Sequence, residues 1–321
     1  MKDNILITGG LGLVGKSLVS LLSRKNYNVF VLDKSKNKIR NKLIKGKKIK
    51  FVYGNFQNKP LIEKIVKKNK ISIIFHTGAI TQVLDGLKKP YETYKNNIMG
   101  TINILHCIKK INPKIIFIFS SSDKAYGEAK NKYYLETDNL SSVYPYDLSK
   151  SCADLICQSY SNVYGLKIGI VRCGNLYGPG DFNKNRIIPE TIMSALDNKK
   201  LKIRSSGKLV RDYLYITDAV DAYYMIMKNL KLNNSKNLLI YNVGSKDNMS
   251  VIKLVNLILS LMNKKHLKPI ILNKSKKELI FQKLNYSKIK RELNWKQKVT
   301  IKKGLRYTIN WYTKHYTILN K

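Results

Sequence analysis

Tyr146 and Lys150 stand four residues apart in the segment YPYDLSK, which reads as the start of a helix. A spacing of four places both side chains on one face of a helix, about one turn apart. An ammonium group beside a phenol favours the phenolate, so we expect Lys150 to lower the pKa of Tyr146. The pair would then act as a general base near neutral pH. Because the chain has 21 tyrosines, such a pair also arises by chance, and its meaning depends on its surroundings.

A second group of reactive side chains follows an apolar run of strand type. Residues 115–120 form this run, and Ser121, Ser122, Asp123 and Lys124 come directly after it. In an open parallel sheet, ligands bind at the edge where the strands have their carboxyl ends. We therefore expect these polar groups to face a ligand site.

A glycine-rich turn offers a place for a phosphorylated cofactor. Residues 5–15 read ILITGGLGLVG, in which Gly9, Gly12 and Gly15 follow an apolar strand and open a helix. Glycines at this spacing let a pyrophosphate approach the backbone, and the helix N-terminus adds free N–H groups and a favourable dipole. The turn therefore predicts dinucleotide binding.

The end of the next strand indicates which dinucleotide is bound. Asp33 stands there, where a carboxylate accepts the ribose hydroxyls of adenosine and repels a 2′-phosphate. Lys34 and Lys36 would instead favour the 2′-phosphate of NADP, but exposed charges are screened within about 8–10 Å. We expect the cofactor to be NAD.

The elements that must position these groups alternate along the first half of the chain. Nearly all-apolar runs of strand type alternate with helical patterns, which is typical of an α/β protein with a doubly wound parallel sheet. Strands without polar alternation indicate helices on both faces of that sheet. The expected strands are 5–8, 29–33, 49–53, 71–76, 115–120 and 167–173, and the expected helix before the last is 144–163.

From about Gly174 onward the predicted strands become short and helices dominate. We expect a NAD-binding domain over residues 1–173, including the helix with Tyr146 and Lys150. Residues 174–321 would form mainly a smaller substrate-binding lobe, with one segment able to return to the first sheet. The expected elements of this part are strands 201–204, 240–243 and 270–272 and helices 187–197, 217–230, 250–262 and 300–313.

Composition limits the other classes of protein. The 321 residues are 44% hydrophobic and 25% charged, which excludes a disordered or fibrous chain. The net charge of +40 comes mostly from lysines spread along the chain, and their densest run, 34–50, has no aromatic residue for stacking bases. We therefore expect no specific nucleic acid partner.

No apolar stretch reaches the length of a membrane helix, and the strand-like start leaves no room for a signal peptide. Four cysteines without metal-ligand spacing predict no metal site and a reducing, cytoplasmic location.

Several blocks in the same order along the chain resemble the extended short-chain dehydrogenase/reductases, and among them the NAD-dependent nucleotide-sugar epimerases and dehydratases. The resemblance covers nearly the whole chain and implies a Rossmann-type sheet with a smaller C-terminal lobe. The blocks are ITGGLGLVG, HTGA, NIMGT, SSSDKAYG, YPYDLSK, VRCGNLYGPGD, RIIPETI, VRDYLYITD and YNVGS.

The resemblance implies a role for each reactive side chain. Tyr146 would take the proton of the sugar C4 hydroxyl, Ser122 would hydrogen-bond that oxygen, and Lys150 would hold the nicotinamide ribose. Asn175, Arg186 and Arg211 match positions that bind the nucleotide diphosphate, and scarce arginines suit phosphate better than generic surface lysines. The implied cofactor contacts are Gly9, Gly12, Leu13, Val14, Gly15, Asp33, Asn55, Phe56, Thr77, Gly78, Ala79, Asn97, Ser120, Tyr146, Lys150 and Cys173, with Asn55 standing where an Asp is usual.

The residues after Ser122 favour a 4,6-dehydratase, closest to the CDP-glucose and GDP-mannose types. By the resemblance, Asp123 would protonate the departing C6 oxygen and Lys124 would remove the C5 proton. The segments ELIFQKLNYSK and GDFNKNRIIP also fit that reading better than a UDP-glucose 4-epimerase, which stays the alternative. A non-catalytic, nucleic-acid-binding relic of the fold is a remote alternative. The family further implies a homodimer through helices 91–110 and 144–163, and a part in polysaccharide biosynthesis through activated-sugar supply.

Overall fold

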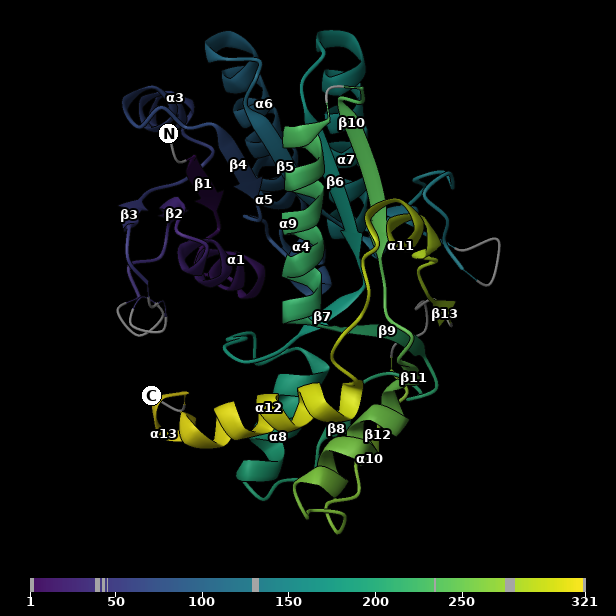
Figure 1. Cartoon of the computed structure of the whole chain (residues 1–321). Helices are drawn as coiled ribbons and strands as arrows, with labels where there is room; N and C mark the ends of the chain where they lie inside the picture. The colour runs from purple at the N-terminus through teal and green to yellow at the C-terminus, as the bar shows by residue number, and fades with distance from the viewer. Residues whose placement is uncertain are drawn as a thin grey trace.

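The structure is a computed structural model that describes residues 3–37, 41, 44, 46–128, 133–233, 235–274 and 281–319. Parts of the lysine-rich run 34–50, and residues 278–280 of the segment ELIFQKLNYSK, lie outside the described residues. The chain has a large upper body and a smaller lower lobe, with the N-terminus on the former and the C-terminus on the latter (Figure 1).

The large body is built on a parallel sheet. Its strands are β1 (Asn4–Thr8), β2 (Asn28–Asp33), β3 (Ile49–Tyr53), β4 (Ile73–His76), β5 (Ile116–Ser122), β6 (Ile168–Cys173) and β10 (Leu238–Val243). Over the described residues these seven strands lie in the order β10-β6-β5-β4-β1-β2-β3, and every neighbouring pair is parallel. The sheet therefore grows in both directions from β1, and the expected doubly wound fold is confirmed.

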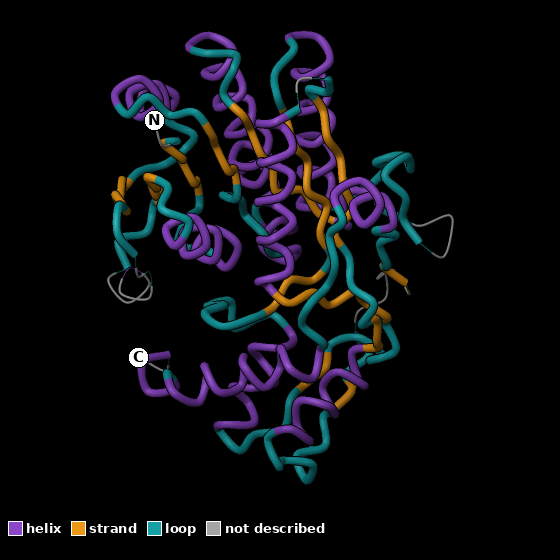
Figure 2. Tube along the Cα trace, viewed as in Figure 1, coloured by secondary structure: helices purple, strands orange, loops and turns teal. Residues whose placement is uncertain are grey.

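Helices cover both faces of this sheet, as the tube view shows (Figure 2). On one face α1 (Leu13–Arg24) and α9 (Ile216–Leu232) share an apolar core with the strands. On the other face the core is shared with α3 (Lys59–Lys68), α6 (Gly100–Ile111) and α7 (Pro145–Tyr164). All four residues of β4 are buried, as expected for a strand covered on both sides.

The helix that carries Tyr146 has clear boundaries in the sequence. Pro145 occupies its first turn, where the missing N–H costs nothing, and Asp147 adds a negative charge near the N-terminus. Gly165 ends the helix in the left-handed conformation, with φ of 67°. The predicted helix 144–163 thus lies within one residue of the observed one.

The loops between the central strands hold shorter elements. A π-helix before α6 is continuous with it, and a single turn of 3-10 helix follows β5 directly. These elements are α4 (Val83–Lys88), α5 (Pro90–Tyr94), η1 (Lys95–Met99) and η2 (Asp123–Tyr126).

The lower lobe contains short strands and several helices. Strand β9 (Val210–Tyr215) is central: it pairs parallel with β7 (Asn175–Tyr177) and β13 (Phe281–Gln282) and antiparallel with β11 (Asn248–Ser250). Strand β8 (Lys202–Ile203) pairs with β12 (Ile270–Ile271). The helices of this part are α8 (Ile187–Leu196), α10 (Val251–Leu261), α11 (Ser287–Leu293), α12 (Ile301–Lys314) and α13 (Tyr316–Leu319).

The chain crosses between the two bodies more than once. After β9 it returns upward through α9 and then runs back down through β10, which pairs with β6 at the edge of the large sheet (Figure 1). It then goes back to the lobe through β11 and α10. In the parts of the chain that the structure describes, no helix is long and apolar enough to cross a membrane.

Candidate active site

A cavity of about 2540 Å³ lies where the large sheet meets the lobe. Its wall includes the carboxyl ends of β1, β4 and β5 and the first turn of α7, together with residues of β7, α8 and β8. Cavities that hold one drug-sized ligand measure about 300–1,000 Å³. This cavity is therefore large enough for two such ligands together.

The glycine turn forms one part of the cavity wall, and its backbone leaves no space for side chains. Gly9 has a φ of 65°, and a Cβ atom there would lie 2.5 Å from the Cα of Gly78. A Cβ at Gly15 would lie 2.3 Å from the carbonyl oxygen of Gly9. The turn packs tightly against β4 and α1, so its backbone is open only toward the cavity, which fits a pyrophosphate.

Asp33 lies beside this turn at the end of β2. Its Oδ2 accepts the backbone N–H of Leu11 at 3.0 Å, and its Oδ1 accepts that of Ser35 at 2.9 Å. These bonds fix the carboxylate at the cavity wall, where it can still accept from ribose hydroxyls through its remaining lone pairs. The glycine turn and Asp33 together fit NAD.

The structure places all but one of the predicted cofactor residues in the cavity wall. The exception is Asn97, which is buried behind the wall: its Oδ1 accepts the N–H of Ile80 at 2.9 Å, and its Nδ2 donates to the hydroxyl of Ser149 at 2.8 Å. Asn97 therefore supports the loop after β4 from behind. The residues that do line the wall are Gly9, Gly12, Leu13, Val14, Gly15, Asp33, Asn55, Phe56, Thr77, Gly78, Ala79, Ser120, Tyr146, Lys150 and Cys173.

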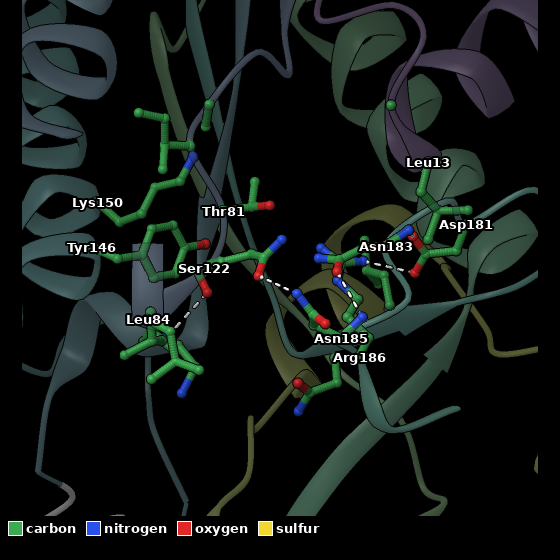
Figure 3. Close-up of a pocket in the computed structure, with 18 of the residues that line it drawn as sticks. Leu13, Thr81, Leu84, Ser122, Tyr146, Lys150, Asp181, Asn183, Asn185 and Arg186 are labelled. Carbon is green, nitrogen blue, oxygen red and sulfur yellow. Dashed lines mark hydrogen bonds and ion pairs between the residues drawn. The ribbon is translucent and has the colours of Figure 1, made fainter. Parts of the chain in front are cut away.

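Tyr146 and Lys150 project from the first turns of α7 toward the end of β5. Figure 3 shows the Tyr146 hydroxyl pointing into the cavity beside the Ser122 hydroxyl, with Lys150 next to it along the helix. The Nζ of Lys150 donates to the carbonyl oxygen of Ser120 at 2.7 Å and lies 5.0 Å from the ring centroid of Phe119. The predicted pair is thus brought together with Ser122 at one point of the wall.

The protonation of this pair differs from the expectation. Burial raises the pKa of Tyr146, as does the neighbouring carboxylate of Asp147, while Arg186 and the hydrogen bond to Ser122 act in the opposite direction. Burial lowers the pKa of Lys150 to about 8. The expectation that Lys150 brings the pKa of Tyr146 below its ordinary value is therefore not met, because withdrawal of the phenol from water has the largest effect.

Asp123 and Lys124 follow Ser122 in the short helix η2. Asp123 is buried, and burial raises its pKa. Its Oδ1 accepts the Ser122 hydroxyl at 3.0 Å, whereas its Oδ2 has no hydrogen-bond partner among the described residues. The Nζ of Lys124 is 3.3 Å from Oε1 of Gln282. Both side chains line the cavity, so an acid and a potential base stand next to Tyr146.

The predicted diphosphate residues also line the cavity, and Figure 3 shows Arg186 across the cavity from Tyr146. Arg186 begins α8, and its Nη1 lies 3.1 Å from Oδ2 of Asp181. Arg211 on β9 donates to the carbonyl oxygen of Val210 at 3.0 Å. Asn175, on β7, also lines the cavity. Two guanidinium groups thus line the cavity.

The loop that precedes α8 is bonded to the large body at two places. Lys16, on α1, donates to the carbonyl oxygen of Gly180 at 2.7 Å. Asn185 donates to Oε1 of Gln82, after β4, at 3.2 Å. These bonds hold the loop against the side of the cavity that contains the glycine turn.

Two acidic residues of the site belong to the sequence motifs, but the sequence predicted no role for them. Asp147 lies between Tyr146 and Lys150 in YPYDLSK, lines the cavity, and has its pKa raised to about 6, chiefly by burial. Asp181 ends the block VRCGNLYGPGD and positions Arg186. The presence of an acidic residue inside each motif was the sequence signal that could have identified these two residues. Among the described residues, no group of three or more His, Cys, Asp or Glu side chains is arranged to hold a metal ion.

Comparison with curated proteins gives a relative that matches most of this chain. The dTDP-D-glucose 4,6-dehydratase of Dictyostelium discoideum is 34% identical over 276 residues, which cover 81% of this chain and 62% of that relative. The chain therefore spans less than two thirds of that relative's length.

Two solved structures resemble the whole chain. The dTDP-glucose 4,6-dehydratase from Bacillus anthracis, in complex with NAD, has a TM-score of 0.86 and 29% identity over 98% of each chain. The UDP-glucose 4-epimerase from Thermotoga maritima, with UDP-glucose, has a TM-score of 0.88 and 27% identity over 98% of this chain and 99% of that one.

The family model described as the NAD dependent epimerase/dehydratase family matches residues 5–244. This range contains the glycine turn, Asp33, most of the cavity wall and the strand that completes the sheet. The resemblance noted in the sequence is confirmed, and the chain belongs to the NAD-dependent epimerase/dehydratase family.

Proposed function

We propose that this chain is an NAD-dependent 4,6-dehydratase of a nucleotide-diphosphate hexose. The observation that carries the proposal is the position of Asp123 and Lys124 in the cavity wall directly after Ser122. Oxidation and reduction at C4 need only a base near the hydroxyl, whereas loss of water across C5 and C6 needs a second acid and base. A 4-epimerase has no use for that second pair.

The first step requires a base at the C4 hydroxyl. Tyr146 takes that proton, Ser122 orients the oxygen, and Lys150 binds the ribose of the nicotinamide. NAD, when bound, supplies a cationic ring that accepts a hydride and later returns it. The glycine turn and Asp33 hold its pyrophosphate and adenosine ribose.

The second step is the elimination. A ketone at C4 makes the neighbouring C5 proton acidic, and Lys124 removes it. Asp123 protonates the C6 oxygen as it leaves as water, and its Oδ2, buried without a protein partner among the described residues, is the oxygen available for this. Lys124 then returns a proton to C5, and the product is a 4-keto-6-deoxy sugar.

The two lobes divide the binding of the ligands. We assign NAD to residues 1–173 and the sugar nucleotide mainly to residues 174–321, with β10 belonging to the large sheet. Arg186, Arg211 and Asn175 bind the diphosphate, since guanidinium groups bond phosphate oxygens in pairs.

A panel of nucleotide-diphosphate hexoses tests the proposal. The purified chain, supplied with NAD, is expected to yield a product lighter by one water molecule, with a ketone at C4. An isomer of unchanged mass would instead establish the second candidate, a 4-epimerase, which the similarity to the Thermotoga maritima enzyme favours. Comparing nucleotides within the panel identifies the base.

We also propose a homodimer formed through helices α5 to α7. Their outer faces expose Tyr91 (69%), Met99 (49%), Leu155 (50%) and Val163 (68%), large apolar side chains that a second copy would cover. Light scattering on the purified chain is expected to give twice the 37.0 kDa of one chain.

The cellular setting is proposed from the same chemistry. All four cysteines are unpaired, which is typical of a reducing compartment, and we place the enzyme in the cytoplasm. Its product would supply activated deoxy sugars for surface polysaccharides. Deletion of the gene is expected to remove such a sugar from the cell's glycans.

A further inference from the structure

A buried lysine stands near the start of α1, where a positive charge is unfavourable. Lys16 is the fourth residue of this helix and is only 7% exposed. A cation near a helix N-terminus opposes the helix dipole. Burial of a lysine also costs free energy unless its partners replace the lost water. The contacts of the Lys16 ammonium group must therefore offset both costs.

These contacts lie in the lower lobe. The Nζ of Lys16 donates to the carbonyl oxygen of Gly180 at 2.7 Å. It also lies 5.4 Å from the ring centroid of Phe182 and 5.9 Å from that of Trp311, distances at which a ring face attracts a cation. The two rings meet edge to face. Because Phe182 belongs to the loop 178–186 between β7 and α8, and Trp311 to α12, one side chain of α1 joins two segments of the lobe.

The backbone of the loop 178–186 is shaped around this ammonium group. Gly180 has a φ of 77°, in the left-handed region that favours glycine, and a Cβ atom there would collide with the Nζ of Lys16. The next residue, Asp181, is 5% exposed, and its carbonyl oxygen accepts the hydroxyl of Tyr312 on α12. The loop is therefore fixed by α1 at Gly180 and by α12 at Asp181.

The fixed part of the loop carries the carboxylate that orients Arg186. Oδ2 of Asp181 lies 3.1 Å from Nη1 of Arg186, and Oδ1 accepts the backbone N–H of Asn183 at 3.0 Å (Figure 3). The carbonyl group that Lys16 binds belongs to the peptide unit between Gly180 and Asp181. Lys16 is therefore connected to Arg186 through one peptide unit and one carboxylate.

We propose that Lys16 is a positioning residue for the substrate, which holds the loop 178–186 in the conformation in which Arg186 meets the diphosphate of the sugar nucleotide. This inference rests on the diphosphate role proposed above for Arg186, and it applies to a dehydratase and to an epimerase alike. Without the ammonium group the loop loses its bond to α1. The cost of ordering Arg186 then falls on substrate binding and lowers the affinity.

Binding measurements on Lys16→Met test the proposal, because methionine removes the charge and keeps a side chain of similar length. The probe is whichever of UDP, dTDP, CDP and GDP the wild type binds most tightly in calorimetry with NAD present. The variant is expected to bind this probe about tenfold more weakly, the scale of one hydrogen bond to a charged group. The Kd of NAD should stay unchanged. An unchanged Kd of the probe, or an equal loss of NAD affinity, would overturn the proposal.

Steady-state kinetics separate positioning from a general loss of structure. In Lys16→Met the KM of the sugar nucleotide should rise about tenfold while kcat stays unchanged, since Tyr146, Ser122 and Lys150 are untouched. A partly unfolded enzyme would instead show a lower kcat with an unchanged KM, which would contradict the proposal. Lys16→Arg keeps a cation with N–H donors and is expected to recover most of the affinity.

The matched control is a second lysine of α1. Lys25 ends this helix, is exposed, and places its Nζ 4.6 Å from the ring centroid of Tyr224. Lys25→Met removes the same charge without touching the loop 178–186, so both Kd values should match those of the wild type. A loss of probe affinity equal to that of Lys16→Met would mean that only the net charge matters, against the proposal.

A double variant shows whether Lys16 acts through Arg186. In an Arg186→Ala background, Lys16→Met should weaken the probe little further. The same loss in both backgrounds would refute the connection. If Arg186→Ala alone binds the probe as the wild type does, the diphosphate role of Arg186 fails. A loss in Arg186→Ala without one in Lys16→Met refutes the positioning role alone.

A variant of α12 tests the same loop should Lys16→Met fail to fold. Trp311 is partly exposed and contacts Lys16 and Phe182. Trp311→Leu removes the ring from both, so the probe should again bind more weakly while the Kd of NAD stays unchanged. Wild-type affinity for the probe in Trp311→Leu would overturn the proposal.

Discussion

The helix α7 holds two buried carboxylates in contrasting surroundings. Asp154, in its third turn, accepts from Nε of Arg172 at 2.9 Å and from Nη2 at 2.8 Å, and also from Ser121 and Gln158. Asp147, two turns earlier, has an Oδ1 with no hydrogen-bond partner among the described residues. Two residues of the same type on the same helix therefore differ in how fully hydrogen-bond donors surround the carboxylate.

The difference separates a residue that stabilises the fold from one that serves the site. A buried carboxylate costs much free energy unless donors surround it, and Asp154 has them. Asp147 lies beside Tyr146, Asp123 and Lys124 in the cavity wall, and burial raises its pKa to about 6 although the charge of Lys124 opposes this. Uncompensated polar groups of this kind cluster where ligands bind.

The largest effect is expected on catalysis at the cavity end of α7. Tyr146→Phe removes the base but keeps the ring, so turnover of the sugar nucleotide should fall at least about a thousandfold, within the range of general-base catalysis. Binding of NAD, measured by equilibrium dialysis, should stay unchanged. Retained turnover would show that Tyr146 takes no part in the reaction. The first turn of α7 would then not differ in function from the turn that holds Asp154.

In the third turn of α7, Asp154→Asn should lower the free energy of unfolding by about 3–5 kcal/mol, because it leaves the Arg172 guanidinium buried without its carboxylate partner. Urea unfolding measures this loss. The matched control is Asp221→Asn, which breaks the exposed pair with Lys298 and should cost less than about 1 kcal/mol. Equal losses of unfolding free energy in both variants would mean that burial of the Asp154–Arg172 pair does not increase the cost of breaking it.

Asp147→Asn should raise the free energy of unfolding, whereas Asp154→Asn lowers it. The carboxyl keeps its proton more readily in the folded chain, with a pKa of about 6 against 3.8 when unfolded. Its contribution to stability is therefore full below pH 3.8 and is lost as the pH rises through 6. The variant should be more stable than the wild type by about 2–3 kcal/mol above pH 7, and equally stable in acid. A destabilised variant at neutral pH would show that Asp147 is compensated after all.

The smallest effect sharpens the description of Asp154. Gln158 donates to Oδ1 of Asp154 at 2.8 Å, in addition to Arg172 and Ser121. Since the other donors remain, Gln158→Ala should cost only about 0.5–1.5 kcal/mol in the free energy of unfolding. A loss as large as that of Asp154→Asn would mean that the donors act as one unit.

The sequence allowed the backbone of the site to be predicted, because the signals were local. Glycine spacing, apolar strands and the position of Ser122 at a strand end all follow from residues close together in the chain. They located the cavity walls, and nearly all of the predicted site residues lie in those walls.

The protonation of the site could not be predicted in the same way. Spacing placed Lys150 near Tyr146, but the pKa of the phenol depends on how completely the fold removes it from water. The same holds for Asp147, whose neighbours Asp123 and Lys124 come from the end of another strand. The support that Asn97 gives to the loop after β4 could not be predicted either, because no local pattern shows which side of a loop a side chain supports.

The return of the chain through α9 and β10 affects how the protein is made. Side chains of α9, including Tyr223, Ile226 and Met227, are buried in the core of the large sheet, and β10 covers the edge of β6. On the ribosome, the N-terminal half therefore emerges with a bare apolar face and an unpaired edge, both prone to aggregation. It can close its core only after residue 243 has left the exit tunnel, so synthesis of much of the lobe precedes completion of the nucleotide-binding half.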